Sequence, residues 1–89
     1  MVYVFDIEAD NLLDEVTRIH CLSFKCIDEL PLDHAIAGTL TTKEDIIKFF
    51  NIPNATYVGH NIIRYDFPVL KKIYNINTPK NIIDTLSLS

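Results

Sequence analysis

The first eight residues combine an apolar strand pattern with two acids at its end. Met1 to Ile7 is a nearly continuous apolar run, typical of a strand buried on both faces, and Asp6 interrupts it. Alternate side chains of a strand share a face. The pattern therefore predicts a strand over about Val2–Ile7 with Asp6 and Glu8 on one face. The opposite face would carry Tyr3, Phe5 and Ile7.

Two carboxylates on one face of such a strand repel each other and lose hydration. A divalent cation between Asp6 and Glu8 removes that conflict. The alternative is a strand that runs out into a solvated loop, where both acids face water. Taken alone, the Asp-x-Glu pattern does not separate these two interpretations.

The rest of the chain reads as short elements without repeats or linkers. A capping box with Thr41 as N-cap and Glu44 three residues later predicts a helix that ends near Phe50. Pro68 suits the first turn of a second helix. The predicted elements are strands at about Val16–Lys25, within His34–Leu40, at Ala55–Val58 and at Asn81–Asp84, a turn at Ile27–Asp33, and a helix at about Tyr65–Tyr74.

This order of elements predicts an α/β fold. Three antiparallel strands come first, and strand–helix units follow. The right-handed crossover rule places the fourth strand beside the first. Asp84-Thr85 resembles the start of a further helix.

Asp66 precedes Val69, Leu70 and Ile73, at spacings of three, four and seven residues. These spacings place Asp66 on the buried face of the second helix. One interpretation is helix capping or stabilisation by the helix dipole. The other is a third carboxylate that points back at Asp6 and Glu8 and shares a metal with them.

Composition bounds these interpretations. The chain has 89 residues, enough for one small domain, and 48% hydrophobic residues support a packed core. A net charge of −4 argues against a general nucleic-acid binder, although a metal-dependent nuclease gathers acids at its site. No apolar run or basic leader indicates a membrane partner or export. Cys21 and Cys26 are expected to be reduced, as in a cytoplasmic protein.

Two segments together resemble a known family. Phe5-Asp6-Ile7-Glu8, followed by Asn61-x3-Tyr65-Asp66, resembles the first two motifs of proofreading 3′→5′ exonucleases with an RNase H-like fold. The similarity is closest to the exonuclease domain of family A DNA polymerases from short-tailed bacteriophages. It extends over nearly the whole chain and includes Leu12-Leu13, His20-Cys21, His60-Asn61 and Ile83-Asp84-Thr85-Leu86.

The resemblance implies a two-metal-ion hydrolase that uses Mg²⁺ or Mn²⁺ and acts on single-stranded 3′ ends of DNA. Asp6, Glu8 and Asp66 take the positions of the metal-binding, catalytic acids. Leu12 takes the place of a residue that wedges against the terminal bases, with packing under its loop as the alternative. Asn61 and Arg64 take places near the DNA. For Asn61 the alternative is a loop turn, and for Arg64 it is an ordinary solvated charge.

The family's third motif, Tyr or His followed four residues later by Asp, does not occur in the sequence. We therefore expect residues 1–89 to be the N-terminal portion of an exonuclease domain, with low activity by itself. A second hypothesis is a non-catalytic member of this lineage that binds DNA, metal or a partner chain. A third is an interaction domain whose acids have no metal role. An incompletely covered sheet also predicts self-association or partner binding through the open face.

Overall fold

The computed structural model describes residues 1–27 and 36–86. Its elements, in chain order, are β1 (Val2–Ala9), β2 (Ile19–Cys26), β3 (Ala37–Leu40), α1 (Lys43–Phe49), β4 (Thr56–Gly59), the π-helix η2 (Ile62–Asp66), α2 (Phe67–Tyr74) and β5 (Ile82–Asp84). Within these described residues, no helix is long and apolar enough to cross a membrane.

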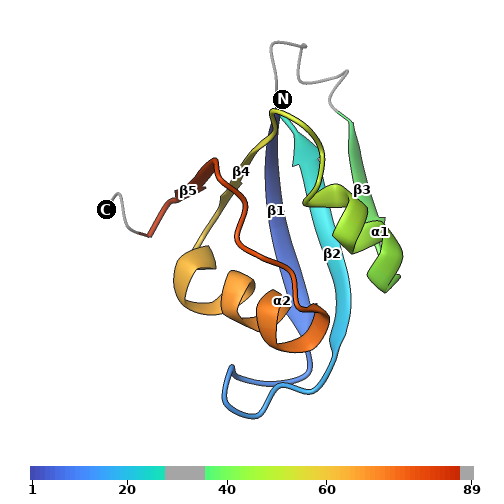
Figure 1. Ribbon diagram of the computed structural model, residues 1–89, viewed down its shortest axis with the longest axis vertical. Helices are drawn as coiled ribbons and strands as arrows, with labels where there is room; N and C mark the ends of the chain where they lie inside the picture. Colours follow the sequence, from blue (N-terminus) through green and yellow to red (C-terminus); the bar gives the residue numbers. More distant parts are fainter. Residues whose placement is uncertain (28–35, 87–89) are drawn as a thin grey trace.

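The strands form one mixed sheet in the order β3-β2-β1-β4-β5 (Figure 1). β1 pairs with β2 and β2 with β3 in antiparallel fashion, whereas β4 lies parallel to both β1 and β5. The predicted α/β class is confirmed, and so is the position of β4 beside β1. The physical reason is the crossover through α1, which returns the chain to the sheet in the same direction as β1.

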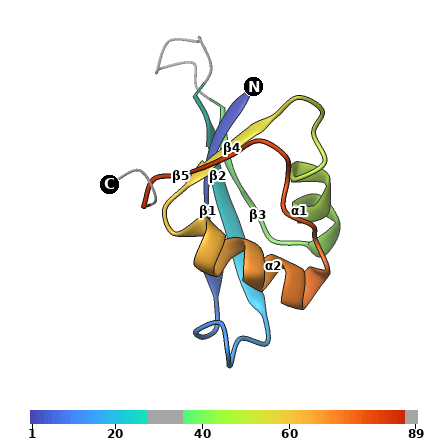
Figure 2. The ribbon, with the colours of Figure 1, turned by 60° about the vertical axis from the view of Figure 1, so that its left-hand side comes forward.

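Both helices lie on the same side of the sheet (Figure 2). The predicted alternation in β1 is confirmed, because Tyr3, Phe5 and Ile7 are buried while Asp6 and Glu8 are exposed. The expectation that β1 is buried on both faces is wrong. No described element covers the second face, which leaves Val4 38% exposed there.

The covered face holds an aromatic core. Phe49 of α1 is 4% exposed and lies between rings of the sheet, 5.2 Å from the centroid of Tyr3 and 5.2 Å from that of Tyr57. Phe5 contacts both Phe50 and Phe67, at centroid distances of 5.1 and 5.6 Å. The same core therefore holds β1 against α1 and against the first residue of α2.

The first helix begins one residue later than predicted. Thr42, not Thr41, is the N-cap, and its side chain accepts a hydrogen bond from the backbone N–H of Asp45 at 3.2 Å. Both threonines have an acid three residues later, so the local sequence is compatible with either start. The start at Thr42 places Ile46 and Phe49 on the buried face of α1.

The predicted second helix is two elements. Ile62–Asp66 forms a π-helix, and the α-helix begins only at Phe67, with Pro68 in its first turn as predicted. α2 ends at Tyr74 and is followed by the C-cap residue Asn75, which adopts the left-handed conformation with φ 58°. Short π-helical segments are uncommon and concentrate at functional sites, so the segment that leads into Asp66 is structurally distinctive.

The other predicted elements hold with shifted ends. The second strand begins at Ile19 rather than at Val16. Val16 lies in the preceding loop, where its side chain is buried. β3, β4 and β5 fall where strands were predicted. Of the predicted turn at Ile27–Asp33, residues 28–33 lie outside the described residues.

Candidate functional site

Asp66 lies at the junction of η2 and α2 and is 3% exposed. Its side chain makes no helix-capping hydrogen bond. Instead, Oδ2 accepts a hydrogen bond from the backbone N–H of Ile7 in β1 at 3.3 Å. The capping interpretation of Asp66 is therefore wrong, and its carboxylate does point back at the strand that carries Asp6 and Glu8.

The ladder between β1 and β4 explains this contact. The backbone of Met1 bonds toward β4, since its carbonyl accepts from Thr56 N–H at 2.8 Å, and every second residue of β1 faces the same edge. The pairing with β4 reaches only Val4, so the N–H of Ile7 faces an edge that β4 leaves open. Asp66 satisfies that buried donor, which fixes its carboxylate against the residue that separates Asp6 from Glu8.

Asp6 and Glu8 are exposed on the uncovered face of β1. Burial is the main cause of the raised pKa of Asp66, and the negative charge of Asp6 adds to it. Burial raises the pKa of the Tyr65 phenol, and the negative charges of Asp66, Asp10 and Glu8 add to this rise in that order. In the part of the chain that the structure describes, no three acid, histidine or cysteine side chains form a group arranged to hold a metal.

Burial raises the pKa of Asp66 from its usual 3.8 to about 7. The hydrogen bond from Ile7 opposes this rise, and the negative charges of Asp6 and Asp84 add to it. A buried carboxyl whose pKa is raised by burial and by negative charge is a common feature of functional sites. Oxygen ligands of this kind suit Mg²⁺ and Mn²⁺, so the donors at Asp6 and Asp66 fit the expected metal.

Hydrogen bonds from Tyr65 of η2 and Lys72 of α2 hold the loop between β1 and β2. The hydroxyl of Tyr65 donates to the carbonyl of Asn11 at 2.6 Å, and Nζ of Lys72 donates to the carbonyl of Leu13 at 3.0 Å. Tyr65 is half-buried and packs against the core. Leu12 lies between these anchors and is 76% exposed, so the alternative that it packs under the loop is wrong.

Asp10 has a structural role in this loop. Its carboxylate accepts from the backbone N–H groups of Thr17 at 3.0 Å and Arg18 at 3.1 Å, and from the Thr17 hydroxyl. These hydrogen bonds, the one from the Thr17 side chain above all, lower the pKa of Asp10 to about 2. Asp10 therefore closes the loop that presents Leu12.

Asn61 precedes η2 in the left-handed conformation, with φ 60°. Its Oδ1 is buried and has no hydrogen-bond partner within the described residues. A buried acceptor without a partner is uncommon, and because Oδ1 is covered by the protein it does not face solvent. Arg64 is exposed on η2 and lines the same pocket as Asn61, together with Ile63, Asp84 and Leu86.

Asp84 is a residue whose role the sequence did not reveal. It ends β5, is 5% exposed, and accepts hydrogen bonds from the backbone N–H groups of Asn61 and Ile63, each at 2.9 Å. The carboxylate of Asp84 also accepts a hydrogen bond from Leu86 N–H at 2.9 Å, and only this third bond is of the kind expected if Asp84-Thr85 started a helix. Residues beyond Leu86 lie outside the described part. In the sequence, the only signal for this role of Asp84 was an acid at the end of the last predicted strand.

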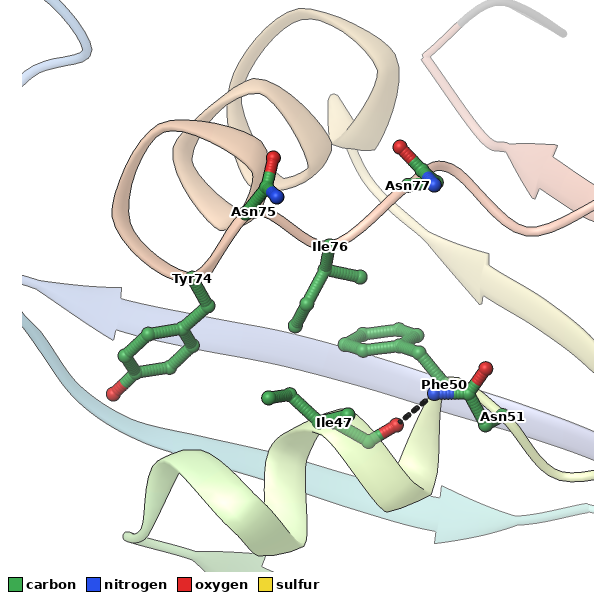
Figure 3. Close-up of a pocket in the computed structure, with 7 residues that line it drawn as sticks. All are labelled: Ile47, Phe50, Asn51, Tyr74, Asn75, Ile76 and Asn77. Atoms are coloured by element: carbon green, nitrogen blue, oxygen red, sulfur yellow. Dashed lines mark hydrogen bonds between the residues drawn. The ribbon is translucent and has the colours of Figure 1, made fainter.

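A separate pocket lies between α1 and the end of α2 (Figure 3). Ile47, Phe50 and Ile76 form its apolar part, and Nδ2 of Asn51 donates to the carbonyl of Ile47 at 2.8 Å across its edge. None of the residues that line it carries a carboxylate, so it offers no carboxylate ligand for a hard cation.

No protein-family model matches this chain, and no curated protein matches it. The motifs in the sequence and the position of Asp66 beside β1 are the features that bear on function.

Proposed function

We propose that this chain is part of a two-metal-ion 3′→5′ exonuclease of the proofreading type, with an RNase H-like fold, from a phage-type DNA polymerase. Its substrate would be the 3′ end of single-stranded DNA. The observation that carries the proposal is the buried Asp66, which meets β1 between Asp6 and Glu8 through the N–H of Ile7. Two distant segments that resemble one family's motifs thereby come together at one edge of the sheet.

The mixed strand order supports this proposal, because antiparallel strands followed by parallel strand–helix units are what the resemblance implies. Asp6, Glu8 and Asp66 would hold the Mg²⁺ or Mn²⁺ ions. When bound, such ions activate water and stabilise the departing 3′ oxygen. The exposed Leu12 is available to contact terminal bases by apolar packing, which tolerates any sequence. Arg64 is exposed and available for a phosphate, and Asn61 lines the same pocket.

We expect slow turnover from these residues alone, since the sequence contains no Tyr-x3-Asp or His-x3-Asp motif to supply a fourth carboxylate. The test is incubation of the purified chain with 5′-labelled single-stranded DNA and Mn²⁺. Shortening from the 3′ end should occur in the wild type and be lost in Asp6→Ala. Asp45→Ala, which removes an exposed acid of α1, is the matched control and should retain the activity.

A result in which Asp6→Ala shortens DNA as fast as the wild type would contradict the proposal, because the activity would then come from elsewhere. The second candidate is a non-catalytic module of the same lineage that binds DNA, metal or a partner chain. It is favoured by the lack, among residues 1–27 and 36–86, of three acids already arranged around a metal. Mn²⁺ binding that depends on Asp6 and Asp66, without any loss of 3′ nucleotides, would identify this case.

A further inference from the structure

Asp84 joins the end of β5 to the loop that leads into the candidate site. Its Oδ1 accepts from Asn61 N–H and from Leu86 N–H, and its Oδ2 accepts from Ile63 N–H, all at 2.9 Å. The side chain is buried, and these bonds, that from Ile63 above all, hold its pKa below the usual range. A buried carboxylate with three backbone donors is a strong and directional anchor.

The residues that Asp84 anchors, Asn61 and Ile63, lie at the start of η2. Asn61 is in the left-handed conformation, and Ile62–Asp66 is π-helical, a geometry that needs support from its surroundings. Gly59 lets Ile62 pack closely against the end of β4, because a Cβ there would lie 2.4 Å from Cγ2 of Ile62 and 3.1 Å from the carbonyl of Phe5. The start of η2 therefore packs on the end of β4 and is hydrogen-bonded to the carboxylate of Asp84 at the end of β5.

The position of Asp66 follows from this anchorage. Asp66 is the last residue of η2, and its Oδ2 accepts from Ile7 N–H at 3.3 Å. A shift in the start of η2 would move this carboxylate along the open edge of β1. No contact between Asp84 and Asp66 is needed for that effect, since the short η2 segment transmits it.

We propose that Asp84 is a positioning residue, which fixes the start of η2 so that the carboxylate of Asp66 stays against β1 beside Asp6. The expected effect of Asp84 on metal affinity rests on the proposed function. Its effect on the position of Asp66 does not. Loss of an outer residue that orients a metal ligand lowers metal affinity by about 10- to 100-fold. We expect the loss of Asp84 to lower metal affinity by a factor in this range.

The test compares Asp84→Asn with the wild type and with Asp45→Asn, which removes the same charge from an exposed site on α1. Calorimetry measures Mn²⁺ affinity, and hydrogen exchange measures protection of the Ile7 amide, which donates to Asp66. The amide of Thr56, which donates to Met1 O at 2.8 Å, is the internal reference. General destabilisation lowers both protections equally, whereas misplacement of Asp66 lowers that of Ile7 alone.

We expect Asp84→Asn to weaken Mn²⁺ binding at least about 10-fold and to lower the protection of Ile7 relative to Thr56, while Asp45→Asn changes neither. A folded Asp84→Asn protein with wild-type affinity and wild-type protection of Ile7 overturns the inference. If the wild type binds no Mn²⁺, the proposed function fails, and the Ile7-to-Thr56 comparison alone decides the role of Asp84. If Asp84→Asn does not fold, Asp84→Ser, which keeps one acceptor, is judged by the same two measurements.

Discussion

Replacement of Asp66 by asparagine should make this protein more stable at neutral pH. The folded state raises the pKa of Asp66 from 3.8 to about 7, chiefly through burial. Between these values the folded state binds more protons than the unfolded state, so the contribution of Asp66 to the free energy of unfolding falls as the pH rises. The asparagine side chain carries no charge at any pH and keeps an oxygen that can accept from Ile7 N–H.

The expected magnitude follows from the size of that change. Each pKa unit corresponds to about 1.4 kcal/mol, so the whole difference gives a maximum of about 4 kcal/mol. Relaxation and entry of water around a buried carboxyl when it ionises reduce the effective penalty below this maximum. We therefore expect the free energy of unfolding of Asp66→Asn, relative to that of the wild type, to rise by about 2 kcal/mol from pH 4 to pH 8.

The assay is urea denaturation of both proteins at pH 4, 6 and 8, without metal and then with Mn²⁺ at pH 8. Other carboxyl groups titrate in both proteins, so their contributions cancel in the difference. Mn²⁺ should stabilise the wild type through binding to the folded state and stabilise Asp66→Asn much less. A difference between the two proteins that stays constant from pH 4 to pH 8 would refute the reasoning, because Asp66 would then titrate as a solvated acid.

Three further predictions test the loop, the core and the open face of the sheet. Asp10→Asn should lower the protection factors of the Thr17 and Arg18 amides, taken relative to intrinsic exchange at the same pH. In the wild type, the lowered pKa stabilises the loop above pH 3.8 and that stabilisation is lost toward about pH 2, so acid should lower the same protection factors. Unchanged protection in the variant would show that the loop does not need Asp10. Phe49→Ala should cost about 3 to 5 kcal/mol in thermal or urea unfolding, since Phe49 is 4% exposed among aromatic rings; a cost below about 1 kcal/mol would mean that α1 is not packed on the sheet. The uncovered face of β1 should support self-association that Val4→Lys weakens, and sedimentation velocity that shows a monomer at high concentration would contradict this.

The local pattern was sufficient to predict most elements. The alternation of Tyr3, Phe5 and Ile7 with polar or exposed neighbours determined which face of β1 is buried. Handedness then placed β4 beside β1. The spacing of Asp66 from Val69 and Leu70 correctly placed it on a buried helical face. Except for the handedness, each of these features depends on periodicity within a few residues, which a sequence records directly.

Other features depended on contacts between distant segments. The choice of Thr42 over Thr41 as N-cap and the π-helical form of Ile62–Asp66 have no clear local signal. The π-helix is supported by Gly59 and by Asp84, which lies 21 residues after Ile63. These supporting residues belong to β4 and β5, so the sequence of Ile62–Asp66 does not record them.

By itself, the sequence determined the order of strands and helices and the acids that face away from the core, and it led to the prediction of a family from motifs that those acids resemble. Only the tertiary structure decided that β4 stops short of Ile7, that Asp66 fills the resulting gap, and that Asp84 holds the loop before it. The physical reason is that buried donors and acceptors must find partners. Which partner each one finds depends on where neighbouring strands end in space.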